Sequence, residues 1–162
     1  MDFINPTQGK LTLDRVVQDM FDFIGEVPGS EYRIIIGSDS QNKESRRTTT
    51  FVTALIVHRV GKGARYYFHR RTRPMIKNLR QRMFTEASLS LMVCGELREL
   101  FLQGQQPRDL GSLEVHLDVG QNGKTEPLIK ELVGWVEGSG YEAKIKPDSF
   151  VASKVADRYT RM

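Results

Sequence analysis

The sequence predicts an α/β domain built on a mixed sheet of five strands, flanked by helices and preceded by one extra helix. Apolar residues recur with strand-like spacing or runs in five segments and with helical spacing in four. The second half of the chain then alternates between the two patterns. With 162 residues, of which 39% are apolar and 27% charged, the chain suits a single domain with a real core.

We expect the extra helix over residues 13–24, with Thr12 as its N-cap and Gly25 at its end. Residues 32–36 form a continuous apolar and β-branched run before Gly37. Such a run is typical of a central strand that is buried on both faces. The chain is therefore divided into an N-terminal helical extension, residues 1–30, and a main domain, residues 31–162.

Two more strands follow the central strand after a polar stretch at residues 38–47. They are expected over residues 48–59 and 65–71, with a glycine-rich turn between them at residues 61–63. Three consecutive strands joined by such short connections predict an antiparallel meander.

Pro74 is expected to open a long helix that ends at Gly104. Beyond it the elements alternate: a strand over 113–119, a helix over 125–136, a strand over 141–145 and a helix over 150–160. Helical crossovers imply that the last two strands run parallel to the central strand.

Cysteine usage and the absence of long apolar runs point to a cytoplasmic protein with no membrane partner. Cys94 is the single cysteine, which excludes a disulfide framework and a cysteine-built zinc or iron–sulfur site. No apolar run approaches the ~20 residues that a membrane-spanning helix needs. Residues 1–10 lack the basic and apolar regions of a signal peptide.

Charge is segregated along the chain although the net charge is only +4. Residues 43–82 contain twelve Lys or Arg and one acid, whereas the rest contains twelve Lys or Arg and nineteen Asp or Glu. Such a run is often only a solvated surface, but an electropositive face is also typical of a protein that binds nucleic acid, whether RNA, DNA or a hybrid. The candidate nucleic-acid-binding residues are Arg46, Arg47, Arg70, Arg71, Arg73, Lys77 and Arg80.

Three stretches of sequence are similar to the YkuK-type ribonuclease H-like family. They are Ile36-Gly37-Ser38-Asp39-Ser40-Gln41, His116-Leu117-Asp118-Val119-Gly120, and Lys146-Pro147-Asp148-Ser149-Phe150 continuing through Val155-Ala156-Asp157-Arg158-Tyr159. The resemblance covers the chain from Glu31 onward. It implies a ribonuclease H-like fold, and with it a nuclease activity that depends on metal ions.

Asp39 and Asp118 follow the first and fourth strands of the main domain. If these strands are parallel neighbours, strand order reverses between them, and sites in open α/β sheets form at such switch points. Two aspartates held close together need a proton or a cation to compensate their charge, and their oxygens suit Mg²⁺ or Mn²⁺. Either aspartate alone is more simply the cap of a turn.

Glu86 and an acid near the C-terminus complete the candidate site. Glu86 lies on or beside the apolar stripe of the long helix, either as a functional acid or as a boundary residue that reaches water. The family resemblance implies that a glutamate of this helix faces the aspartate of the first strand. It also implies an acid on the last helix, for which Asp157 is favoured over Asp148, because Asp148 and Ser149 suit a helix cap.

The catalytic and metal-binding quartet is thus Asp39, Glu86, Asp118 and Asp157, holding two Mg²⁺ or Mn²⁺ ions ~3.5–4 Å apart. The sequence favours a metal-dependent endonuclease that hydrolyses phosphodiester bonds of structured nucleic acid: an RNA·DNA hybrid, RNA or branched DNA. The alternative is a non-catalytic nucleic-acid-binding module with the same fold.

Overall fold

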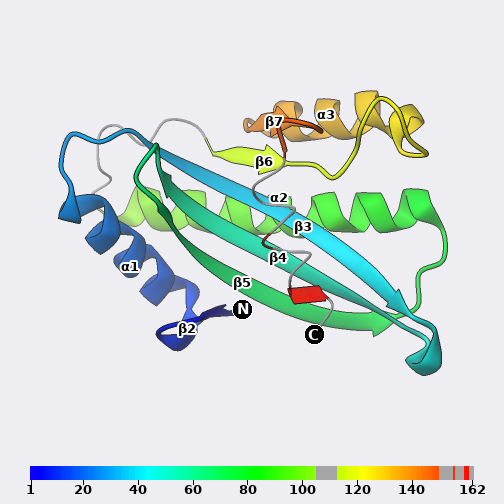
Figure 1. Cartoon of the computed structure of the whole chain (residues 1–162), viewed down its shortest axis with the longest axis horizontal. Coiled ribbons are helices and arrows are strands. Elements are labelled where there is room, and N and C mark those ends of the chain that lie inside the picture. The colour runs from blue at the N-terminus through cyan, green and yellow to red at the C-terminus, as the bar shows by residue number, and fades with distance from the viewer. Residues whose placement is uncertain (105–112, 150–154, 156–158, 161–162) are drawn as a thin grey trace.

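In the part of the chain that the structure describes, seven strands form one mixed sheet in the order β2-β1-β5-β4-β3-β6-β7 (Figure 1). The computed structural model describes residues 1–104, 113–149, 155 and 159–160. The strands are β1 (Asp2–Asn5), β2 (Gly9–Thr12), β3 (Tyr32–Lys43), β4 (Thr48–Arg59), β5 (Ala64–Pro74), β6 (Glu114–His116) and β7 (Glu142–Lys144). The helices are α1 (Leu13–Glu26), α2 (Leu79–Gln103) and α3 (Ile129–Gly138), with two short 3₁₀ helices, η1 (Glu44–Arg46) and η2 (Glu126–Leu128).

The expected strand order of the main domain is confirmed. β3, β4 and β5 form the antiparallel meander, while β6 pairs in parallel with β3, and β7 in parallel with β6. β3 is therefore the strand of the meander that borders the parallel strands β6 and β7. Its junction with β6 is the point where strand order reverses.

The expectation of five strands is wrong, because the N-terminal segment contributes a hairpin as well as a helix. β1 pairs antiparallel with β2 along its length and with β5 at Ile4 and Phe68. Neither strand has the length or apolar alternation that would reveal it from sequence. In the folded chain the hairpin covers the edge of β5, where unpaired backbone groups would otherwise be exposed.

β3 is longer than the apolar run that predicts it. It pairs with β4 from Tyr32 to Lys43, so Ser38, Asp39 and Ser40 lie within a strand rather than in a polar loop. Pro74 likewise ends β5 instead of opening the long helix. α2 begins later, where the Asn78 side chain accepts a hydrogen bond of 2.9 Å from the Gln81 amide.

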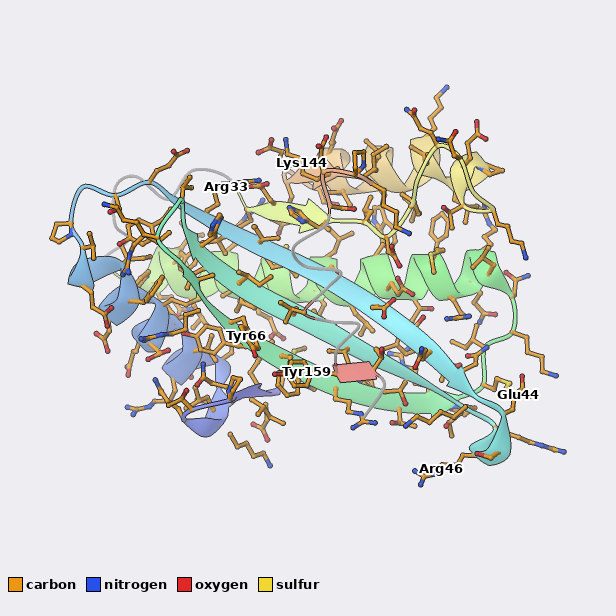
Figure 2. All side chains as sticks on the ribbon, viewed as in Figure 1. Arg33, Glu44, Arg46, Tyr66, Lys144 and Tyr159 are labelled. Atoms are coloured by element: carbon orange, nitrogen blue, oxygen red, sulfur yellow. The ribbon has the colours of Figure 1, made fainter. Side chains whose placement is uncertain are left out.

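The two faces of the sheet are covered differently. α1, α2 and α3 pack on one face, here called the helix face, against residues such as Ile34, Ile36 and Leu55. The opposite face carries Ile35, Val52, Ala54, Ile56 and Phe68, with Tyr66, Val155 and Tyr159 packed against them (Figure 2).

Of the helix expected over residues 150–160, the structure describes Val155, Tyr159 and Thr160, and the others lie outside the described residues. The Tyr159 ring stacks on Phe68 with 3.8 Å between ring centroids, and its hydroxyl is hydrogen-bonded to the Tyr66 hydroxyl at 2.8 Å. The end of the chain is thereby held against the face opposite the helices.

We predict that Asn5→Ala destabilises the protein by ~1–3 kcal/mol, the cost of leaving buried polar groups without partners. The buried Asn5 side chain accepts from the Thr7 and Gln8 amides and donates to the Tyr66 carbonyl oxygen at 3.1 Å, so it joins the hairpin turn to β5. Urea unfolding measures the difference. Thr7→Ala, an exposed change in the same turn, is the control, and equal stability of the two variants would contradict the assignment.

Candidate active site

The pairing between β3 and β6 ends shortly before the two aspartates. The parallel register joins Gly37 to His116, and Asp39 and Asp118 each stand two residues further along. Asp39 remains in β3, whereas Asp118 lies past the end of β6. The two carboxyl groups therefore flank the point where the strands separate, beyond the carboxyl end of β6, as a switch-point site requires.

Glu86 reaches this region from the helix face. It lies on α2 with 5% of its surface exposed, and it accepts a hydrogen bond of 2.5 Å from the Ser40 hydroxyl. Ser40 and Asp39 are neighbours in a strand, so their side chains point to opposite faces. Asp39 accordingly emerges on the opposite face, where Thr160 donates to it at 3.4 Å.

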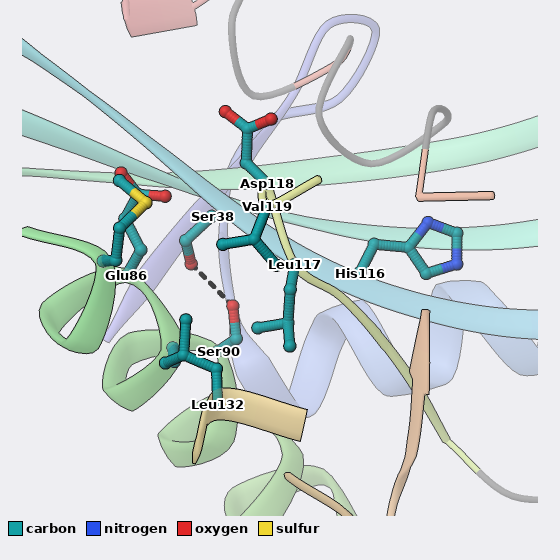
Figure 3. A pocket seen from close by; sticks show the side chains of 10 residues that line it. Ser38, Glu86, Ser90, His116, Leu117, Asp118, Val119 and Leu132 are labelled. Carbon is teal, nitrogen blue, oxygen red and sulfur yellow. Dashed lines mark hydrogen bonds between the residues drawn. The ribbon is translucent and has the colours of Figure 1, made fainter. Parts of the chain in front are cut away.

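A polar seam joins α2 to β3 beneath the site. Arg82 donates to the Ser40 carbonyl oxygen at 2.9 Å, and the Ser90 and Ser38 hydroxyls are 2.7 Å apart. Arg82, Glu86 and Ser90 recur every four residues, the spacing that places side chains on one face of a helix. Figure 3 shows Glu86 and Asp118 around a narrow pocket that the Ser38–Ser90 hydrogen bond also lines.

Burial raises the pKa of Glu86 well above its ordinary value, and the carboxylates of Asp39 and Asp118 raise it further. The Ser40 hydrogen bond and the charge of Arg82 act in the other direction. Because the net shift is upward, the site favours a proton on Glu86 or a nearby cation that would restore the charged form.

Asp118 is paired with a lysine in the turn that follows the neighbouring strand, β7. The Lys146 ammonium lies 2.7 Å from the Asp118 carboxylate, and more than half of the Lys146 side chain is exposed. The β6–β7 ladder continues past the assigned strands, with hydrogen bonds from the Leu117 amide to Lys144 and from the Lys146 amide to Val119. These bonds bring Lys146 alongside Gly120, and from there its side chain reaches back to the Asp118 carboxylate.

The fourth acid of the predicted quartet, Asp157, lies outside the described residues. Its substitute Asp148 is exposed in the turn that follows β7. The charges of Asp39 and Asp118 thus both act on Glu86, although the Asp39 side chain lies on the other face of the sheet. The choice between Asp157 and Asp148 stays a prediction.

The donor chemistry of the three acids fits a hard divalent cation, since carboxylate oxygens are the ligands that Mg²⁺ and Mn²⁺ prefer. The burial of the Glu86 carboxyl, whose pKa the charges of Asp39 and Asp118 raise, is in keeping with this fit. Among residues 1–104, 113–149, 155 and 159–160, no three His, Cys, Asp or Glu side chains form a ready-made metal group.

Three of the predicted nucleic-acid-binding residues gather at one end of the sheet. Arg46 and Arg47 are exposed at the turn between β3 and β4, and Figure 2 shows Arg46 at this far end. The Met75 amide donates to the Arg47 carbonyl oxygen at 3.0 Å, which brings the exposed Lys77 close by. Arg46, Arg47 and Lys77 are called the basic tip below.

The arginines of β5 do not share one face, which corrects the expectation of a single electropositive surface. Arg70 pairs across Val52 and lies on the face of Asp39, whereas Arg71 and Arg73 alternate to the helix face. The last candidate, Arg80, is exposed and forms an ion pair of 2.7 Å with Glu131. Side-chain alternation along a strand causes this division.

Sequence reasoning missed three residues of the site: Ser40, Arg82 and Lys146. In the sequence, Ser40 belongs to a polar stretch between two strands and Arg82 to a run of basic residues, and neither pattern marks a site residue. Lys146 belongs to a motif of the family resemblance, but nothing local connects it with Asp118. Only the register of the parallel strands would have revealed that pair.

An α/β fold with a mixed sheet of this kind fits the ribonuclease H-like proteins, and a family model described as Ribonuclease H-like matches residues 15–161. The chain belongs to this family. It is 36% identical to the uncharacterized protein YkuK of Bacillus subtilis (strain 168) over an alignment of 170 residues, which covers 98% of this chain and 96% of YkuK. No solved structure matches the chain. Among the described residues, no helix has both the length and the apolar character to cross a membrane.

We predict that Glu86→Gln stabilises the metal-free protein at neutral pH and that the gain vanishes in acid. A carboxyl whose pKa is raised by folding contributes full stability below its unfolded pKa of ~4.3 and loses it as pH rises through the folded value. Glutamine can still accept the hydrogen bond from Ser40. Because its side chain does not ionise, it does not lose stability as pH rises. Thermal unfolding across a pH series should show a gain of a few degrees, since ~1 kcal/mol moves Tm by ~2–4 °C at this size.

The matched control for this change is Glu96→Gln, an exposed glutamate on the same helix, which should leave Tm unchanged at every pH. A pH-independent difference between wild type and Glu86→Gln would contradict the assigned ionisation.

Proposed function

We propose that this chain is a metal-dependent nuclease that hydrolyses phosphodiester bonds of structured nucleic acid. The observation that carries the proposal is the parting of β3 and β6, which leaves Asp39 and Asp118 beside a buried Glu86 whose pKa both of them raise. Clustered carboxyls of this kind are costly unless they serve a purpose such as binding a cation. Membership of the ribonuclease H-like family supports the same conclusion.

In this proposal Asp39, Glu86 and Asp118 hold two Mg²⁺ or Mn²⁺ ions, with Asp157 as the fourth ligand. The ions, when bound, supply activation of a water for in-line attack and stabilisation of the leaving oxygen. Ser40 and Arg82 orient the Glu86 carboxyl through the hydrogen bonds of the polar seam. Binding of a cation to Asp118 would release Lys146, whose ammonium is then free to contact a substrate phosphate.

The basic tip is the proposed docking surface for the nucleic-acid backbone. It lies at the same end of the long strands as Asp39, and its three cations are exposed. Phosphate contacts of this kind position a substrate without reading its sequence. Structured substrates such as an RNA·DNA hybrid, duplex RNA or branched DNA present the closely spaced phosphates that such a surface binds.

A second candidate, the non-catalytic nucleic-acid-binding module, is favoured by one specific observation. Lys146 neutralises Asp118, and the raised pKa of Glu86 favours its neutral form. Two of the three described acids thus present little net charge to a phosphate backbone in the absence of metal. A binding module needs nothing more, so cleavage itself is the measurement that separates the two functions.

We predict that Asp39→Asn or Asp118→Asn lowers cleavage by at least ~100-fold, the scale of losing one group that stabilises the transition state electrostatically. Nucleic-acid binding should be retained or tightened, because each change removes negative charge from the phosphate path. The assay compares an RNA·DNA hybrid, duplex RNA, single strands and a four-way junction with Mg²⁺ or Mn²⁺.

Asp22→Asn, an exposed change on α1, is the control that should cleave like the wild type, and Asp39→Asn is the control for a contaminating nuclease. Equal losses of binding and cleavage in the site variants would refute their assignment. If the wild type binds nucleic acid in a salt-sensitive way but cleaves no substrate, the result supports the non-catalytic binding module instead.

We also predict that Arg46→Glu combined with Lys77→Glu weakens nucleic-acid binding and flattens its dependence on salt. Each lost phosphate contact should lower the log–log salt slope by about 1. The matched control reverses two exposed cations outside the basic tip, Arg15→Glu on α1 with Lys62→Glu in the β4–β5 turn, and changes total charge equally. Fluorescence anisotropy over a salt series measures both, and the same slope for the two double variants would rule out the basic tip as the docking surface.

A further inference from the structure

A cavity of about 500 Å³ opens beside the candidate site, at the carboxyl ends of β6 and β7. One wall is the loop that follows Asp118, residues 120–123 together with Thr125, and the other is Lys146 and Pro147. Its volume falls within the ~300–1,000 Å³ of pockets that bind small organic ligands. The predicted quartet does not use this cavity.

Lys146 connects the cavity with the acids. Its side chain lines the cavity, while its ammonium lies 2.7 Å from the Asp118 carboxylate. Its stem lies against Gly120, where an added Cβ would be only 3.3 Å from the Lys146 Cβ. The backbone hydrogen bond from Lys146 to Val119, 2.9 Å long, fixes this approach. A ligand in the cavity would therefore lie next to whatever occupies the acids.

The lining of the cavity suits a ligand whose neutral polar part carries a single anionic group. Gln121 and Asn122 provide carboxamides, which donate and accept hydrogen bonds as nucleobase edges do. Pro147 adds an apolar ring, and Lys146 is the single cation among the lining residues. A polyphosphate would call for more cations, and an apolar peptide for more apolar surface. A sugar and base attached to one phosphate match this lining.

We propose that this cavity, here called the nucleoside pocket, binds the sugar and base of the nucleotide that adjoins the scissile phosphate. The inference rests on the proposed nuclease function and narrows its substrate. A base within a continuous duplex is stacked and paired, and entry into a protein pocket requires that it leave the stack. The preferred substrate is therefore nucleic acid with an unpaired nucleotide next to the cleaved bond.

The test uses two glycine variants of the whole chain. Gly123→Leu adds a bulky side chain at a residue that lines the nucleoside pocket, and Gly134→Leu adds the same side chain on α3. An added Cβ meets open space at both sites, and neither glycine has a positive φ, so both variants should fold. Asn122→Ala removes one carboxamide and serves as a second pocket variant.

The first measurement is binding of 5′-mononucleotides (AMP, GMP, CMP and UMP) in the absence of divalent cations. NMR chemical shifts of the protein monitor the binding at millimolar nucleotide concentrations. We expect wild type and Gly134→Leu to bind at least one mononucleotide, with shifts confined to residues 120–125 and 146–147. Gly123→Leu should weaken that binding at least tenfold, and Asn122→Ala should weaken it less. Absence of binding to all four, or equal binding by the two leucine variants, would overturn the proposal.

The second measurement is cleavage of a duplex with and without one unpaired nucleotide. Preference of the wild type for the unpaired site, lost in Gly123→Leu and kept in Gly134→Leu, supports the pocket. Cleavage without that preference overturns the pocket and leaves the nuclease proposal standing. Mononucleotide binding that Gly123→Leu removes, with no cleavage of any substrate, supports the pocket and refutes the nuclease.

Discussion

The polar seam between α2 and β3 is the contact on which the candidate site depends. A buried carboxyl would normally be excluded from the interface between a helix and a sheet. Here Ser40 donates to Glu86, Arg82 donates to Ser40, and Ser90 is hydrogen-bonded to Ser38. These bonds fix how α2 sits along β3, because a shift of one turn would leave each of these buried groups without its partner. The same bonds deliver Glu86 to the place where β3 and β6 separate.

The separation of β3 from β6 accounts for both the acids and the nucleoside pocket. Pairing between these strands stops at Gly37 and His116, while hydrogen bonds between the β6 and β7 segments continue to Val119. Asp118 is thereby drawn toward Lys146 rather than toward the meander. The loop after Asp118 and the turn after β7 diverge beyond this ladder, and the cavity lies between them. One topological feature, the reversal of strand order, therefore produces a charged site and a neutral pocket side by side.

Electrostatic balance around the site makes the acids compatible with the proposed binding of nucleic acid. The raised pKa of Glu86 and the ion pair of Asp118 lower the negative charge that the site presents without metal. The cations of the basic tip lie further along the same strands, where they are exposed and separated from the acids. In the proposed function, attraction of the phosphate backbone and hydrolysis of its bonds would fall to different parts of one sheet.

The sequence alone predicted the order of the described elements of the main domain and the parallel pairing of β6 with β3. It also placed Glu86 on or beside the apolar stripe of its helix, because local periodicity reports which side of an element meets the core. It did not predict the β1–β2 hairpin, whose strands are too short to show a period, or the second half of β3, where Ser38 and Ser40 are polar yet buried.

The pairing of Lys146 with Asp118 and the division of the β5 arginines between two faces were decided only by the tertiary structure. These features depend on register between strands far apart in the chain, and register is set when the whole sheet packs against its helices.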